Sequence, residues 1–178
     1  GDMLLNEAMS LLMLFSLKNG EKALLASREI SESAGPEGMI GGQVVDIIDE
    51  NKEISKEELI YMHNKKTGEL IRSSIVSAAI LADAPKKDIK ILNDFGLKLG
   101  LAFQIKDDIL DIVGDASKLG KNTNCDINKS NFISLFGLEY CERECIKLTN
   151  ECIELLKSLS VDAIDLNELT LELLNREF

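Results

Sequence analysis

Hydrophobic residues recur along this chain at the three- and four-residue spacing of amphipathic helices. Alternation with a period of two, which indicates strands, is not found over any stretch bounded by turn residues. The pattern predicts helices over residues 3–17, 21–33, 39–50, 56–82, 86–113, 131–158 and 162–175, with a polar loop over 114–130. The predicted fold class is therefore all-α, a bundle of long, mostly antiparallel helices joined by short loops.

Local signals refine several of these helices. The segment 3–17 is apolar nearly all round, which predicts that it is buried on most sides. Ser55 and Glu58 have the spacing of a capping box and predict a helix start. Gly68 lies in the middle of the predicted helix 56–82, where it marks a weak point or a kink.

An acidic stripe runs along the C-terminal half of the predicted helix 86–113. Its members fall at positions i, i+3, i+4 and i+7 and are Gln104, Asp107, Asp108 and Asp111. This spacing places them on one helix face, where carboxylates repel one another and where an apolar stripe would normally lie. Aspartate is also a poor interior helix former, so the pattern suggests a compensating ligand. A hard cation such as Mg²⁺, which takes carboxylate oxygens and bridges to substrate phosphates, is the obvious candidate.

Acidic stripes are also commonly plain solvated helix faces, and the pattern alone does not exclude that interpretation. Two features of the setting favour a cation. The stripe begins within the mostly apolar run 100–104 and does not begin among Lys and Glu partners. It also lies toward a helix C-terminus, an end whose dipole disfavours anions.

Composition narrows the classes of function. The chain has 178 residues, enough for one domain, and 45% of them are hydrophobic, which argues against disorder. The formal net charge is −11, and no basic cluster offsets it, so we expect no nucleic-acid partner. The segment 3–17 contains polar residues and is shorter than a membrane span, so we expect no stable membrane insertion. Cys141, Cys145 and Cys152 are interpreted as small apolar residues in a reducing cytosol, since a zinc site would call for different spacing and histidine ligands.

Further segments carry weaker signals. Gly41 and Gly42 interrupt a predicted helix, which indicates close packing or room for a ligand, and Gln43 and Asp46 share one face of that helix. Taken alone, the pair Lys66-Thr67 is more typical of a solvated lysine face than of a binding site. The lysine-bearing loop 114–130 is likewise, by itself, more typical of an ordinary surface loop.

Taken in order, these segments resemble the trans-isoprenyl diphosphate synthases, in the style of the bacterial farnesyl and geranylgeranyl diphosphate synthases. Residues 103–111 resemble the second aspartate-rich motif of that family. The other matching segments are Gly1-Asp2 with Leu4-Leu5, Gly41-Gly42-Gln43 with Asp46, Lys66-Thr67-Gly68, and Gly114-Asp115 with Gly120-Lys121. The resemblance covers essentially the whole chain and implies a helical bundle around a central cavity.

The resemblance also implies an activity and roles for residues. The protein would condense isopentenyl diphosphate with an allylic diphosphate, geranyl or dimethylallyl, to give farnesyl diphosphate or a similar short-chain product. The resemblance implies that Asp107, Asp108 and Asp111 bind metal and that Lys66 and Lys121 bind the diphosphate. It implies that Thr67, Gln104 and the Lys66 carbonyl stabilise the allylic cation. It also implies that Phe103 borders the isopentenyl site and that Gln43 and Asp46 lie at the cavity wall. Asp107 and Asp111 are the expected direct ligands of Mg²⁺, with Mn²⁺ as an alternative. A cytoplasmic homodimer is expected.

The chain is interpreted as a single helical domain, 1–178, that is incomplete at its N-terminus relative to the family. The family's first aspartate-rich motif and its basic residues for isopentenyl diphosphate lie before the segment that matches Gly1-Asp2. The 178 residues alone are therefore expected to be inactive. The alternatives are a geranylgeranyl diphosphate synthase, a non-catalytic partner subunit of a prenyl synthase, and a class I terpene cyclase. The Lys66-Thr67-Gly68 motif and the pattern from Gln104 to Asp111 disfavour the cyclase.

Overall fold

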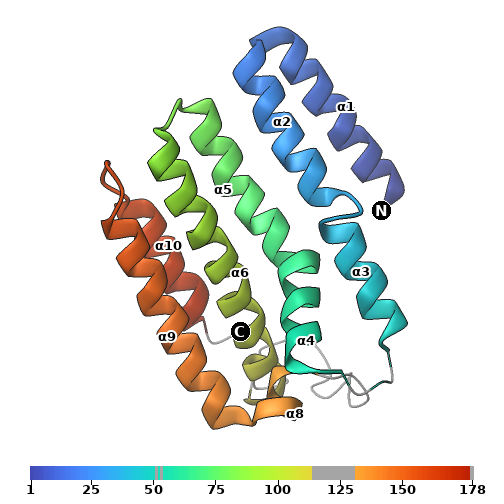
Figure 1. Cartoon of the computed structure of the whole chain (residues 1–178), viewed down its shortest axis with the longest axis vertical. Coiled ribbons are helices and arrows are strands. Elements are labelled where there is room, and N and C mark those ends of the chain that lie inside the picture. Colours follow the sequence, from blue (N-terminus) through green and yellow to red (C-terminus); the bar gives the residue numbers. More distant parts are fainter. Residues whose placement is uncertain (51, 53, 114–130, 177–178) are drawn as a thin grey trace.

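The computed structural model describes residues 1–50, 52, 54–113 and 131–176, which form a bundle of helices (Figure 1). The helices are α1 (Asp2–Asn19), α2 (Glu21–Ala34), α3 (Met39–Ile48), α4 (Lys56–His63), the π-helical turn η1 (Asn64–Gly68), α5 (Glu69–Leu81), α6 (Lys86–Val113), α8 (Phe132–Phe136), α9 (Leu138–Lys157) and α10 (Ile164–Asn175). No strand occurs among the described residues. The predicted all-α fold class is confirmed.

The longer helices stand side by side in a row. Each packs against the next in the order α1, α2, α5, α6, α9 and α10, while α3, α4 and η1 lie toward one end (Figure 1). Helix α6 has the predicted bounds, and its residues contact η1, α8, α9 and α10 as well as α5. The helix that carries the acidic stripe is therefore the one with neighbours on most sides.

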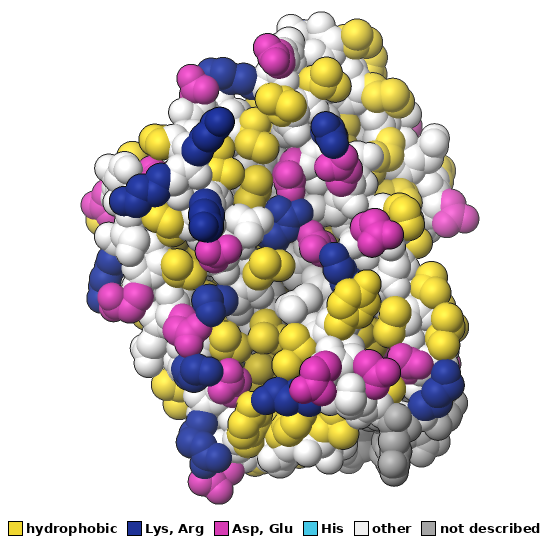
Figure 2. Space-filling model, in the orientation of Figure 1, with side chains coloured by type: hydrophobic (Ala, Val, Ile, Leu, Met, Phe, Trp, Pro, Cys, Tyr) yellow, Lys and Arg dark blue, Asp and Glu magenta, His cyan; other side chains and the backbone are white. Residues whose placement is uncertain are grey.

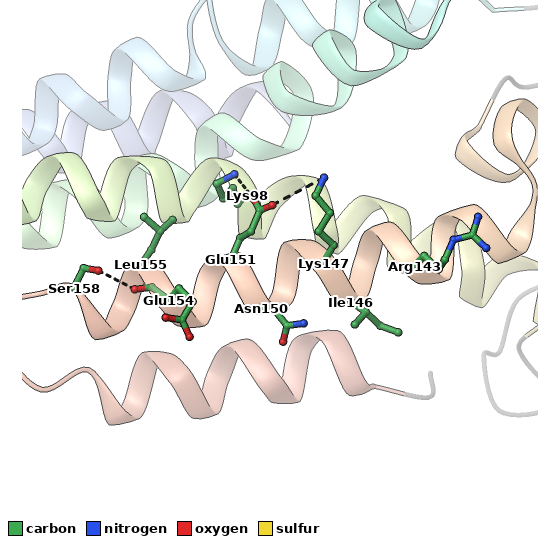
Figure 3. A pocket seen from close by; sticks show the side chains of 9 residues that line it. All are labelled: Lys98, Arg143, Ile146, Lys147, Asn150, Glu151, Glu154, Leu155 and Ser158. Carbon is green, nitrogen blue, oxygen red and sulfur yellow. Dashed lines mark hydrogen bonds and ion pairs between the residues drawn. The ribbon is translucent and has the colours of Figure 1, made fainter.

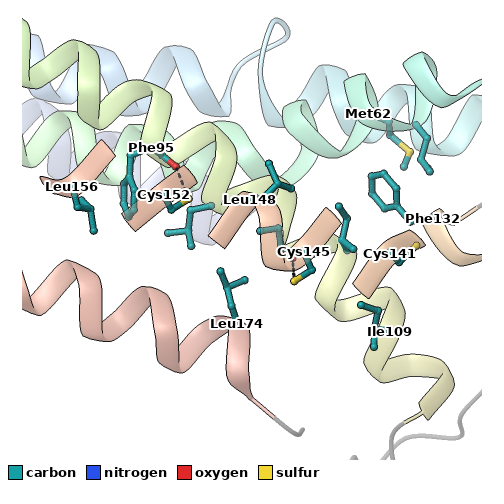
Figure 4. Close-up of a cluster of buried hydrophobic side chains, with 14 residues drawn as sticks. Met62, Phe95, Ile109, Phe132, Cys141, Cys145, Leu148, Cys152, Leu156 and Leu174 are labelled. Carbon is teal, nitrogen blue, oxygen red and sulfur yellow. Dashed lines mark hydrogen bonds between the residues drawn. The ribbon is translucent and has the colours of Figure 1, made fainter. Parts of the chain in front are cut away.

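The hydrophobic core lies largely between α6 and α9, and α4, α8 and α10 complete it (Figure 4). Helix α6 contributes Phe95, Ala102, Ile105 and Ile109, all less than 10% exposed. The last three are the apolar positions on the side of the helix opposite the acidic stripe. Burial of that side orients the helix, so the stripe must face away from α9 and its core.

Three cysteines of α9 belong to this core. Cys141, Cys145 and Cys152 are free and buried (Figure 4). Burial raises the pKa of the Cys141 thiol to about 11 and that of the Cys152 thiol to about 12. Both thiols are therefore neutral at physiological pH and pack as small apolar groups, as the sequence indicated.

The expectation for helix α1 is wrong. The segment 3–17 was expected to be buried on most sides, but α1 has no buried residue, and Leu17 is 85% exposed. The reason is its position at the edge of the row, where α2 is the neighbour it packs along. Figure 2 shows the hydrophobic side chains that result, gathered over the α1 and α2 part of this face. Within the described residues, no helix has both the length and the hydropathy that a membrane span requires.

Two of the predicted helices are interrupted. The segment 131–158 is broken at Gly137, whose φ of 79° ends α8 before α9 begins. The segment 56–82 contains the π-helical turn η1, which ends at Gly68, the predicted weak point. Its start is as predicted, because Ser55 and Glu58 form both hydrogen bonds of the capping box. Turns of this π type insert an extra residue and are frequent at functional sites.

Candidate functional site

The acidic stripe lies in the last turns of α6, with its three aspartates in different surroundings. Asp111 is exposed, while Asp107 and Asp108 are partly buried. Asp107 and Asp111 are one helical turn apart on the face directed away from the core. They are the pair of carboxylates that a ligand could approach from outside the bundle.

Asp108 is engaged with a neighbouring helix. Its Oδ2 accepts a hydrogen bond of 2.7 Å from the backbone amide of Phe132, the first residue of α8. A carboxylate at a helix N-terminus compensates both the orphan amide and the helix dipole. Burial raises the pKa of Asp108 to about 6, and the charges of Asp111 and Asp107 add to the rise, while the Phe132 amide opposes it. In this arrangement Asp108 holds α8 against α6.

Asp107 contacts two side chains. The amide of Gln104 lies 3.5 Å from its Oδ2, and the guanidinium of Arg176 donates to its Oδ1. The same guanidinium lies 3.9 Å from the centroid of the Phe103 ring and donates to the Phe103 carbonyl oxygen at 3.4 Å. Sequence reasoning assigned no role to Arg176, although it is a lone arginine directly after α10. The structure places it against two of the predicted site residues.

A hydrogen bond joins α6 to the π-helical turn. The hydroxyl of Thr67 donates to Oε1 of Gln104 at 2.6 Å. The backbones of α6 and η1 approach each other closely near this bond, since a Cβ on Gly100 would lie 2.7 Å from Cα of Gly68. Glycines at this crossing thus allow the contact between two predicted residues that are 37 positions apart.

Lys66 is paired with Asp46 of α3. Its Nζ lies 2.7 Å from Oδ2 of Asp46, whose side chain is only 6% exposed. Gln43, which was predicted to share a cavity wall with Asp46, is exposed on α3. The structure therefore joins Lys66 to one of the two α3 residues.

An apolar cavity opens beside these groups. It has a volume of about 500 Å³ and lies between η1, α5, α6 and α10. Lys66, Thr67 and Phe103 line it together with Leu70, Ile71, Ser74, Ile75, Phe95, Leu99, Leu166, Leu169 and Leu173. Gln43 and Asp46 are not among its lining residues, so their place at a cavity wall stays a prediction. Lys121, the second predicted diphosphate ligand, lies outside the described residues.

The described residues do not contain a group of three His, Cys, Asp or Glu side chains placed to hold a metal ion. Asp107 and Asp111 nevertheless offer hard oxygen donors one turn apart. Mg²⁺ commonly binds through one or two carboxylates together with substrate phosphates rather than in an all-protein cage. The two residues fit that manner of binding.

A second hollow, of about 790 Å³, lies on the outer side of α9 (Figure 3). Its charges are balanced, because Glu151 pairs with Lys98 and Lys147, and Arg143 pairs with Glu139. None of the predicted site residues lines it. We therefore place the candidate site at the apolar cavity and the adjoining stripe.

Known proteins are similar to this chain over most of its length. The family model described as Polyprenyl synthetase matches residues 1–166. A farnesyl diphosphate synthase of Bacillus subtilis is 39% identical over 173 residues, which are 95% of this chain and 58% of that protein. A farnesyl diphosphate synthase of Micrococcus luteus is 40% identical over 161 residues, 89% of this chain and 55% of that protein. The chain thus spans less than two thirds of the length of these relatives.

A solved structure is similar over much the same length. The geranyltransferase of Helicobacter pylori, complexed with magnesium and isoprenyl diphosphate, superimposes with a TM-score of 0.77 at 33% identity. The match covers 92% of this chain and 55% of that one.

Proposed function

The chain belongs to the polyprenyl synthetase family, and on this basis we propose that the intact protein is a prenyltransferase of the farnesyl diphosphate synthase type. It condenses isopentenyl diphosphate with an allylic diphosphate to give farnesyl diphosphate or a similar short-chain product. The chain spans 58% of the Bacillus subtilis relative, so the activity is proposed for the intact protein and not for this stretch by itself.

One observation carries the proposal. Lys66 and Thr67 line an apolar cavity, and Thr67 is bonded to Gln104, whose amide lies 3.5 Å from Asp107 of the acidic stripe. The hydrogen bond from Thr67 to Gln104 joins the edge of the cavity to the acidic stripe, and Lys66 lines the same cavity. An allylic diphosphate presents a matching set of features, namely an anionic head, a carbon that becomes a cation, and a hydrocarbon tail.

Each group has a task in the proposed reaction. The ammonium of Lys66 binds an oxygen of the allylic diphosphate, and the apolar cavity holds the hydrocarbon tail away from water. The C–O bond breaks, pyrophosphate leaves with the electron pair, and the oxygens of Thr67, Gln104 and the Lys66 carbonyl stabilise the allylic cation. The double bond of isopentenyl diphosphate attacks that cation and forms a C–C bond, which leaves a new cation on the isopentenyl unit. Loss of a proton from this cation to the released pyrophosphate forms the new double bond.

Asp107 and Asp111 are the residues we propose to hold Mg²⁺, or Mn²⁺ in its place. When bound, the ion would neutralise the negative charge that develops on the leaving pyrophosphate. Asp108 contributes indirectly through its bond to the Phe132 amide. Arg176 contacts the carboxylate of Asp107, so its guanidinium must share that carboxylate with a metal ion or give it up.

The proposal is tested by assaying the intact protein with labelled isopentenyl diphosphate and geranyl diphosphate, followed by sizing of the products. We expect a labelled farnesyl product in the presence of Mg²⁺ and none after chelation with EDTA. A geranylgeranyl product would support the alternative chain length. No incorporation by a folded, metal-supplied protein would contradict the proposal and favour a non-catalytic partner subunit.

The intact protein is further proposed to be a cytoplasmic homodimer that pairs through α1. This helix has no buried residue. Leu4 and Leu11 lie on the same face of it, two turns apart, and are 69% and 57% exposed. We expect light scattering to give a dimer mass for the intact protein and a monomer mass for the variant Leu4→Glu/Leu11→Glu. Ile146→Glu, at an equally exposed apolar site on α9, is the control and should remain dimeric. A variant with Glu at both α1 positions that stays dimeric would exclude this surface.

A further inference from the structure

The side-chain ammonium of Lys66 is paired with a carboxylate from another helix. Its Nζ lies 2.7 Å from Oδ2 of Asp46, and the lysine side chain is 33% exposed whereas that of Asp46 is 6% exposed. A buried carboxylate is unfavourable unless hydrogen bonds and charges compensate it, so it has little freedom to move. The aspartate therefore fixes the position of the pair, and the lysine is the member that reaches solvent.

Lys66 is also held at its backbone. A Cβ on Gly42 of α3 would lie 2.2 Å from the amide nitrogen and 2.7 Å from Cα of Lys66, so the two backbones are in direct contact. Lys66 lies in the π-helical turn η1, whose widened geometry sets it apart from a regular helix. Helix α3 thus contacts the same lysine at both ends, one turn apart along α3.

The pair leaves the ammonium able to bind an anion. A lysine ammonium has three N–H donors, and the bond to Asp46 uses one of them. Lys66 also lines the apolar cavity, but Asp46 does not. A diphosphate at the cavity mouth would therefore meet the ammonium and not the carboxylate behind it.

We infer that Asp46 is a positioning residue for the allylic substrate, which acts by holding the Lys66 ammonium at the mouth of the cavity. The inference rests on the proposed function and deepens it, because it adds a residue that orients the diphosphate-binding lysine from outside the substrate cavity. In this role Asp46 acts on the substrate through Lys66 and does not contact the substrate itself.

The neighbouring lysine shows why the arrangement is specific. Lys65 pairs at 3.3 Å with Glu69, which lies one turn away on the same stretch of chain. An ion pair with this spacing can form along any helix. The Lys66 pair instead spans 20 positions and joins two elements. Only this pair, of the two, fixes a lysine relative to the cavity.

The first test compares kinetic constants. Asp46→Asn keeps the shape of the side chain and removes its charge. In the intact protein we expect kcat/KM for the allylic diphosphate to fall about tenfold, the factor associated with one charged hydrogen bond. The KM for isopentenyl diphosphate should stay within about twofold of wild type, because that substrate does not depend on Lys66. Asp49→Asn, at the end of the same helix and paired with Lys52, is the matched control and should behave as wild type.

A double-mutant cycle separates positioning from a merely structural role. If Asp46 acts through Lys66, then Asp46→Asn should have no further effect on kcat/KM in a Lys66→Ala background. Additive losses would overturn the inference. So would an equal loss for both substrates accompanied by a lower urea midpoint, since that pattern reports damage to the fold.

The third readout does not depend on turnover. Acylation of Lys66, followed by mass spectrometry of its peptide, should be several-fold faster in Asp46→Asn than in wild type, with the 65% exposed Lys157 as internal reference. Inorganic pyrophosphate should protect Lys66 in wild type and protect it less in the variant. If the intact protein proves inactive but these differences are found, the proposed reaction fails while the positioning of Lys66 stands. Equal labelling of Lys66 in both proteins would overturn the positioning itself.

Discussion

Replacing Asp107 by Ala is expected to reduce prenyl transfer by the intact protein about a thousandfold. Metal ions that neutralise a leaving group contribute several kcal/mol to transition-state stabilisation, and about 4 kcal/mol corresponds to this factor. Asp107 is one of two stripe carboxylates on the open face of α6, because Asp108 is bonded to the Phe132 amide. The measurement is kcat with isopentenyl and geranyl diphosphates over a range of Mg²⁺ concentrations.

The fold should survive this substitution. It removes a contact with Arg176 but also relieves repulsion with Asp111, one turn along the helix. Glu142→Ala, an exposed carboxylate on α9, is the control and should leave both activity and unfolding unchanged. If Asp107→Ala retains activity within a few fold of wild type, the assignment of Asp107 to the metal site is wrong.

The largest effect on stability is expected at Arg72, where Arg72→Ala should lower the free energy of unfolding by about 3–5 kcal/mol. The guanidinium is 15% exposed and bonds to Glu29 of α2 at 2.6 Å and to Glu69 of α5 at 2.9 Å. It also donates to Asn93 of α6 and to Ser33 of α2. Burial acts to lower the pKa of Arg72, but the bonds and charges of Glu69 and Glu29 outweigh it, so the pKa lies above its ordinary value. Removing the arginine leaves two poorly solvated carboxylates without their shared partner.

Urea unfolding followed by circular dichroism measures this effect, with the midpoint as the readout. Arg28→Ala is the matched control, because Arg28 lies on α2 and pairs with Glu32 at the surface, with a 69% exposed side chain. Exposed pairs of this kind contribute little, so the control midpoint should not shift measurably. A shift of the Arg72→Ala midpoint no larger than that of the control would show that this network does not hold α2, α5 and α6 together.

Helix boundaries were predictable where a local signal marks them. Helix α6 has the predicted bounds because Pro85 precedes it, and α4 begins at the predicted capping box. The break at Gly137 was missed, since a single glycine inside an amphipathic pattern is compatible with a continuous helix. The exposure of α1 was missed because an apolar sequence does not reveal how many neighbours a helix has.

The candidate site was predictable only in part. The spacing of Gln104, Asp107 and Asp111 on one face follows from helical geometry alone. The three aspartates look equivalent in the sequence, yet the structure gives Asp108 to the N-terminus of α8. No role for Arg176 was predictable, because its contact with Asp107 spans 69 positions.

Residue patterns along the chain are enough to establish that it is helical and that a polar, anionic face runs along one long helix within an otherwise apolar stretch. Both properties depend on residues a few positions apart, and the periodicity of the helix connects those residues. The partners of that face, in contrast, depend on how the helices pack against one another. The hydrogen bond from Thr67 to Gln104, the pairing of Lys66 with Asp46 and the close crossing at Gly42 each join different elements. Such contacts depend on how helices pack, and packing is set by the burial of whole faces and not by the spacing of residues within one of them.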